Sequence, residues 1–202
     1  MDALRPRLQL EALRQGLHTA TQVVWISDGA GGFWRLFEQS FATVAVGILD
    51  FDHAAQQLWE VAEVYGYTIP GRTPRRWFER LRQQLRHGYV HHIVKEFSRL
   101  LEYNSTPEAA KPVLMRVRQY LVTHLTHLQY RQFKKLGFLI GSGMVESACK
   151  WLIAQRFKGT GMRCSETRFN HLLHLRLAWV NRRFDPLFAD HSLSLTLYSP
   201  NR

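Results

Sequence analysis

The chain has 202 residues, which is long enough for one domain with a sizeable core and a subsidiary helical lobe. Lys and Arg total 27 against 16 for Asp and Glu, and the resulting net charge of +11 favours a polyanionic partner, nucleic acid above all. The two cysteines, Cys149 and Cys164, exclude a disulfide framework and favour a cytoplasmic setting, while the longest apolar stretch, Phe41 to Leu49, is too short to span a membrane.

The first fifty residues predict a helix followed by a strand, helix, strand unit. Pro6 suits a first helical turn, and Gly16 lies near the end of the leucine-rich helix that follows. Apolar runs predict strands at 23–27 and 44–49, separated by a glycine loop and a short helix. A right-handed connection makes the two strands parallel, so both end at one edge of a sheet.

The pattern changes at Ala54, where apolar residues begin to recur every three or four positions. Up to about Leu136 this spacing predicts helices near residues 58–65, 77–85, 93–101 and 113–125, with Pro107 placed to begin the last. No further strand-like run occurs in this region. The sequence therefore predicts an all-helical insertion after the second strand.

A third region begins with the segment Ile140 to Val145. It predicts a helix from about Gly143 to Phe157 that carries Glu146 in its first turn. A compact basic loop, Arg156 to Arg163, comes next, and a final helix starts near Ser165. The tail after Pro186 is expected to be peripheral.

Acidic side chains occur where these elements predict a crevice. Asp28 closes the first strand, and Asp50 and His53 follow the second. If Glu146 faces the same crevice, it shares a divalent metal with Asp28, which indicates metal-assisted phosphoryl transfer. Each acid also has an ordinary interpretation. Asp28 forms a turn before a glycine, Glu146 satisfies a helix start with Lys150 as its ion-pair partner, and Asp50 and Asp52 cap a helix.

The basic residues near the carboxyl end predict a DNA contact. Glycines in the loop let backbone N–H groups approach phosphate closely, and the candidate side chains are Lys150, Arg156, Lys158 and Arg163. A solvated basic face is the alternative. The histidine pairs His124 with His127 and His171 with His174 have metal-compatible spacing but lack zinc-type partners, so surface or partly buried histidines are expected.

Four motifs together resemble a known family. They are Ser27-Asp28-Gly29-Ala30, the Asp50-x-x-His53 group, the run Ile140 to Ser147 with Glu146, and the basic segment 156–163. This set resembles the DDE transposases of bacterial insertion sequences, which have a ribonuclease H-like core, and the second motif is similar to the Asp-x-x-His signature of Mutator-like members. Cys164 departs from the pattern, since relatives tend to carry an aromatic residue there.

The resemblance implies specific roles. Asp28 and Glu146 become catalytic residues and ligands of Mg²⁺ or Mn²⁺ in a two-metal site, with Asp50 and His53 as a supporting pair. The implied partner is double-stranded DNA at transposon ends, with self-association or a full-length relative as further partners. The family's first catalytic aspartate lies on a strand upstream of a helix like the first one here, so an amino-terminally truncated chain, inactive alone, is expected.

The expected fold is therefore α/β but predominantly helical: a partial ribonuclease H-like core with a large helical insertion. Its parts are the first section of the core at 1–53, the insertion at 54–136, the core helices with Glu146 at 137–185, and a tail at 186–202. Two other functions stay open. One is a non-catalytic DNA-binding or transposase-interacting protein, and the more distant one is an unrelated helical nucleic-acid-binding regulator.

Overall fold

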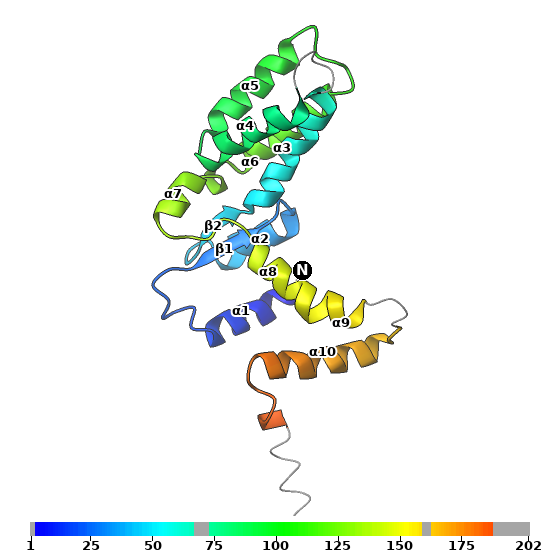
Figure 1. Cartoon of the computed structure of the whole chain (residues 1–202). Helices are drawn as coiled ribbons and strands as arrows, with labels where there is room; N and C mark the ends of the chain where they lie inside the picture. Colours follow the sequence, from blue (N-terminus) through cyan, green and yellow to red (C-terminus); the bar gives the residue numbers. More distant parts are fainter. Residues whose placement is uncertain (1–2, 67–72, 159–162, 188–202) are drawn as a thin grey trace, which may run out of the picture. The chain divides into compact units, whose positions relative to one another are not determined.

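The computed structural model describes residues 3–66, 73–158 and 163–187, without the Arg156 side chain. The chain divides into two compact units, Met1–Ser142 and Gly143–Arg202. It is mostly helical, with one small parallel sheet in the first unit (Figure 1). No helix among the described residues combines the length and the apolar character needed to cross a lipid bilayer.

The first unit begins with the predicted strand, helix, strand arrangement. Helix α1 (Leu4–Arg14) precedes strand β1 (Val24–Ser27), helix α2 (Gly31–Ser40) and strand β2 (Val46–Leu49). The two strands are parallel, as predicted, and pair from Val24 with Val46 to Ser27 with Leu49. β2 starts two residues later than expected because the amides of Val44 and Ala45 donate to the carbonyl of Phe41 in the turn after α2.

Helices alone follow β2 in the rest of the first unit that the structure describes. Four of them form a bundle in which α3 contacts α4 and α6, and α5 contacts α4 and α6 (Figure 1). Their bounds are α3 Phe51–Gly66, α4 Pro74–Arg86, α5 Val90–Glu102 and α6 Lys111–Thr123. A short 3-10 helix, η1 (Leu125–His127), and α7 (Tyr130–Lys135) complete the unit. The predicted helices of this region are thus confirmed, although α6 starts at Lys111 and not at Pro107.

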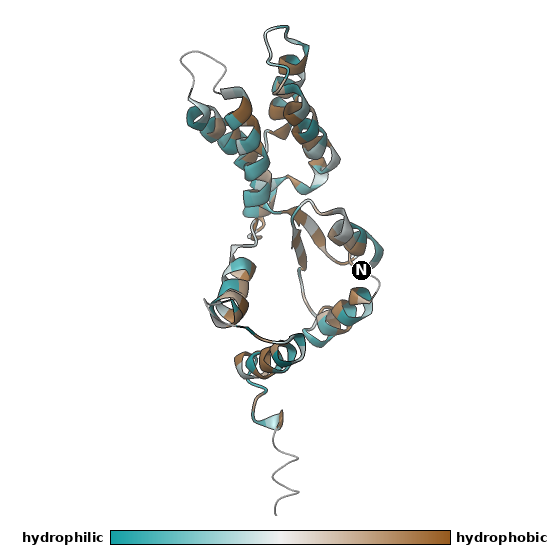
Figure 2. Ribbon diagram, turned by 90° about the vertical axis from the view of Figure 1, so that its right-hand side faces the viewer, coloured by the Kyte–Doolittle hydropathy of each residue, from teal (hydrophilic) through white to brown (hydrophobic). Residues whose placement is uncertain are grey.

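One hydrophobic core joins the sheet to the bundle. Ile48 of β2 and Leu58 of α3 are fully buried in the same cluster as Leu81, Ile93 and Leu114. Burying each such side chain contributes about 1.5–3 kcal/mol. Figure 2 shows polar and apolar residues alternating along the bundle helices, as the three-and-four spacing requires. The packing of the sheet against the bundle therefore fixes the position of the sheet edge.

The second unit contains one long helical run and a second helix. The run comprises α8 (Gly143–Cys149), a π-helical segment η2 (Lys150–Ala154) and α9 (Gln155–Phe157), which matches the predicted span. In α10 (Glu166–Val180) the Ser165 hydroxyl accepts a hydrogen bond from the Arg168 amide at 3.4 Å, as an N-cap does. Phe157 and Phe169 join the two helices, with ring centroids 4.9 Å apart.

Candidate active site

The register of the sheet brings Asp28 and Asp50 to the same edge. Ser27 and Leu49 are the last paired residues of β1 and β2, and each acid follows directly. The Asp50 amide also donates to the Ser27 carbonyl at 2.8 Å, which extends the pairing by one residue. The prediction that both strands end at one edge is confirmed, and two carboxylates lie there.

Asp50 is buried, with only 1% of the residue exposed, and both of its carboxylate oxygens accept hydrogen bonds. Its Oδ1 accepts hydrogen bonds from the amides of Asp52 and His53, both at 2.9 Å, so it caps α3. Its Oδ2 accepts from the Ser142 amide at 2.5 Å. Burial raises the pKa of Asp50, but hydrogen bonds from Ser142 and His53 outweigh burial and hold the pKa below its ordinary value. Asp50 is therefore ionised and uses both oxygens within the protein.

His53 lies beside this carboxylate, as the paired motif predicts. Its Nδ1 is 3.2 Å from Asp50 Oδ1, while 46% of the side chain remains exposed. One nitrogen of the imidazole thus lies against Asp50, and nearly half of the side chain is exposed to solvent. This geometry suits a residue that is oriented by the acid and offers its other nitrogen to a substrate.

Asp28 is only partly engaged. Its Oδ1 accepts from the Ala30 amide at 3.1 Å, and its backbone carbonyl accepts from Trp34 Nε1 at 2.8 Å. The turn-forming interpretation of Asp28 is therefore confirmed. Its Oδ2, however, accepts no hydrogen bond from any residue that the structure describes. One carboxylate oxygen at this edge is left for a ligand.

Tyr120 is a site residue that the sequence pattern did not reveal. It comes from α6, and its ring packs against Gly29. Burial, followed by the negative charges of Asp28 and Asp50, raises the pKa of Tyr120 to about 12. The phenol is therefore a neutral hydrogen-bond donor beside both acids. From its helical spacing, Tyr120 was predicted only to lie on the apolar face of its helix. Its hydroxyl group, among purely apolar neighbours on that face, was the only feature of the sequence that set it apart.

A hollow of about 450 Å³ adjoins the Asp28 turn. It is lined by Gly29, Trp34, His124 and His127, among others. His127 Nδ1 lies 2.9 Å from the Gly47 carbonyl, and its ring centroid is 4.2 Å from that of Trp34. Burial, followed by the charge of His127, lowers the pKa of His124. The expectation of partly buried histidines is confirmed for this pair.

The remaining predicted site residues belong to the second unit. Glu146 is exposed in the first turn of α8, as expected. Lys150, Lys158 and Arg163 are exposed as well. The Arg156 side chain and residues 159–162, with the loop glycines, lie outside the described residues. Glu146 and Asp28 belong to different units, and their convergence on one metal stays a prediction.

Comparison with known proteins leaves the family open. No protein-family model, curated protein or solved structure matches the chain. The function is therefore inferred from the chemistry of the site. Magnesium and manganese prefer oxygen ligands, which Asp28 Oδ2 fits. The Asp50 oxygens are already bonded and the His53 nitrogens suit these cations poorly, so both fit a supporting role better than direct ligation.

Proposed function

We propose that the chain carries part of a ribonuclease H-like transposase core and takes part in metal-dependent cleavage and joining of DNA phosphodiester bonds. The observation that supports this most is the adjacency of Asp28 and Asp50 at the carboxyl edge of two parallel strands. Ligands of open α/β sheets bind at such edges. The order of the motifs, with Glu146 after a helical insertion, agrees with the transposase resemblance.

In this proposal Asp28 and Glu146 hold Mg²⁺ or Mn²⁺. When bound, such cations neutralise a phosphate and activate the attacking oxygen. Asp50 fixes the start of α3 and orients His53. Tyr120, kept protonated beside the acids, donates a hydrogen bond to a phosphate oxygen.

The proposed partner is double-stranded DNA at transposon ends. Lys150, Lys158 and Arg163 are exposed, and none has an ion-pair partner among the described residues. Together with Arg156 they offer positive charge to the phosphate backbone, in line with the net charge of +11. Phosphate contacts position such a protein on DNA without selecting a sequence.

Metal binding tests the shared site directly. Thermal unfolding of the chain is followed while MnCl₂ or MgCl₂ is added, with Asp28→Asn and Glu146→Gln as variants. A ligand that binds only the folded state at a hundred times its Kd stabilises it by about 2.7 kcal/mol. We expect Tm to rise in the parent and not in either variant. Asp52→Asn, an exposed acid near the same edge, is the matched control and keeps the shift.

Paramagnetic broadening locates the cation. Added Mn²⁺ should broaden the NMR signals of the Gly29 and Ala30 amides together with that of Ser147. Broadening of Gly29 without Ser147, or a Tm shift of the same size in Glu146→Gln and the parent, contradicts the shared site.

A non-catalytic DNA-binding protein is the second candidate. The hydrogen bonds that the two acids make within the protein favour it, since Asp28 closes a turn and Asp50 caps a helix without any metal. The metal titration separates the two functions. Salt-dependent DNA binding without any metal response would support this second candidate.

A further inference from the structure

Helix α5 carries two exposed cations that have no partner among the described residues. Lys95 and Arg99 lie one turn apart, and neither forms an ion pair or side-chain hydrogen bond with any residue in the described part of the chain. Together with His92 they line a hollow of about 560 Å³. Positive charge is therefore presented to solvent along one side of α5.

The acid in this hollow is already neutralised. Glu96 Oε2 accepts from Arg80 Nη1 at 2.9 Å, and its Oε1 accepts from Trp77 Nε1 at the same distance. A carboxylate held by a guanidinium and an indole offers little negative charge to Lys95 and Arg99. The hollow therefore favours an anion.

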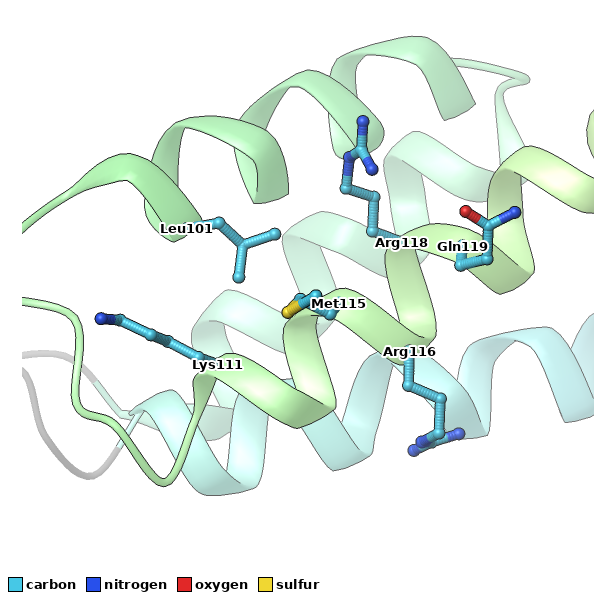
Figure 3. Close-up of a pocket in the computed structure, with 6 residues that line it drawn as sticks. All are labelled: Leu101, Lys111, Met115, Arg116, Arg118 and Gln119. Atoms are coloured by element: carbon cyan, nitrogen blue, oxygen red, sulfur yellow. The ribbon is translucent and has the colours of Figure 1, made fainter.

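A second hollow, between α5 and α6, is a useful contrast. It measures about 540 Å³, and Figure 3 shows Leu101 and Met115 among its charged side chains. Its three cations all have partners: Lys111 bonds Glu108, Arg116 bonds Gln57 and Glu60, and Arg118 bonds Ser98. Those cations are engaged by partners within the protein, whereas Lys95 and Arg99 are available to a ligand.

Stacked rings lie at the start of the same helix. Tyr89 is within 11° of parallel to His87, with centroids 6.4 Å apart, and within 14° of His92, with centroids 5.5 Å apart. All three residues are exposed. Gly88, at φ +79°, makes the turn between α4 and α5 that allows this arrangement. Flat, exposed rings beside unpaired cations are the combination that binds single-stranded nucleic acid.

We propose that the corner between α4 and α5 binds single-stranded nucleic acid. Lys95 and Arg99 contact backbone phosphates, and an unpaired base stacks on the rings around Tyr89. A duplex offers phosphates but keeps its bases stacked inside, so the ring stack favours a single strand. The site lies wholly within the first unit and does not depend on the proposed metal site or on the basic residues after Glu146.

Fluorescence anisotropy of the 202-residue chain with labelled oligothymidine tests the proposal. Lys95→Ala/Arg99→Ala should raise Kd roughly tenfold at low salt, and the slope of log K against log salt should fall by about 1.4, or about 0.7 for each lost phosphate contact. The control Arg7→Ala/Arg14→Ala removes two exposed charges from α1, at the other end of the first unit (Figure 1). It should change Kd less than twofold.

The ring stack is tested with a matched pair of substitutions. Tyr89→Leu should raise Kd roughly fivefold with the salt slope unchanged, since stacking contributes about 1–3 kcal/mol for each base. Tyr89→Phe keeps a ring and should bind as the parent does. Circular dichroism confirms folding of each variant.

Two results would overturn the site. One is an unchanged Kd in both Lys95→Ala/Arg99→Ala and Tyr89→Leu. The other is that Lys95→Ala/Arg99→Ala weakens the binding of oligothymidine and of a duplex competitor equally, while Tyr89→Leu has no effect. That result would mean that positive charge alone attracts any nucleic acid to this surface. Asp28→Asn should bind oligothymidine normally, so failure of the metal site and failure of this site are distinguishable.

Discussion

Tyr120 packs its ring against Gly29, the residue that directly follows Asp28. A Cβ built on Gly29 would lie 2.3 Å from Cε2 of Tyr120, far inside contact distance. Helix α6 therefore approaches the end of β1 closely only because residue 29 has no side chain. This contact ties α6 to the turn that presents the Asp28 carboxylate.

Gly29→Ala should destabilise the protein by about 1–3 kcal/mol, because the added methyl group overpacks the contact with Tyr120. Urea unfolding measures the loss. Gly31→Ala is the matched control, since a Cβ there meets nothing within 4 Å, and we expect it to be close to neutral. In a Tyr120→Ala background the cost of Gly29→Ala should largely disappear. A full cost in that background would show that the Tyr120 contact is not its cause.

The Tyr120 phenol should lose its proton at an unusually high pH. Its pKa of about 12 follows from burial and from the charges of Asp28 and Asp50. Because the folded-state pKa is raised, the protonated phenol contributes stability that is present below pH 10.0 and lost as the pH rises toward 12. NMR of ring-labelled tyrosine follows the titration, with Tyr120→Phe assigning the signal. Asp28→Asn should lower this pKa, and an unchanged value would remove Asp28 from the environment of the ring.

Asp50→Asn should cost about 2 kcal/mol at pH 7, since the carboxylate accepts charge-assisted hydrogen bonds from Ser142 and from the start of α3. The pKa of Asp50 is lowered in the folded state. Its contribution is therefore present above the ordinary value of 3.8 and lost as the pH falls through the lower folded value. Urea unfolding at pH 7 and near pH 3 should show the difference between parent and variant shrinking in acid. Asp52→Asn, with 71% of the side chain exposed, should have little effect at either pH.

Duplex DNA binding should depend on the second unit. Lys150→Ala/Lys158→Ala/Arg163→Ala should weaken binding across sequences and lower the salt slope by about 2.7, or about 0.9 for each phosphate contact. Anisotropy titrations at several salt concentrations measure both quantities. Arg7→Ala/Lys134→Ala/Lys135→Ala removes three exposed charges from the first unit and serves as the control. The same loss in both triple variants would mean that net charge alone, and no defined surface, binds the duplex.

Much of the fold could be predicted because its signals are local. Apolar residues at three-and-four spacing predicted the bundle helices, and two apolar runs around a short helix predicted parallel strands. The adjacency of Asp28 and Asp50 also followed, since parallel strands end at one edge. The boundaries were less accurate: β2 begins at Val46 because the turn after α2 extends into the predicted strand. Hydrogen bonds of that turn compete with the ladder, which an apolar pattern does not show.

The sequence by itself determined which side chains carry charge and which segments form helices and strands. Only the tertiary structure decided how those side chains are used. Ser142, 92 residues after Asp50, donates to its carboxylate, and Tyr120 reaches the same edge from α6. Such partners depend on how the helices pack against the sheet, and side-chain packing joins residues without any fixed spacing along the chain. For that reason the acids and the helix cap made by Asp50 were predictable, whereas the contacts of Ser142 with Asp50 and of Tyr120 with the Asp28 turn were not.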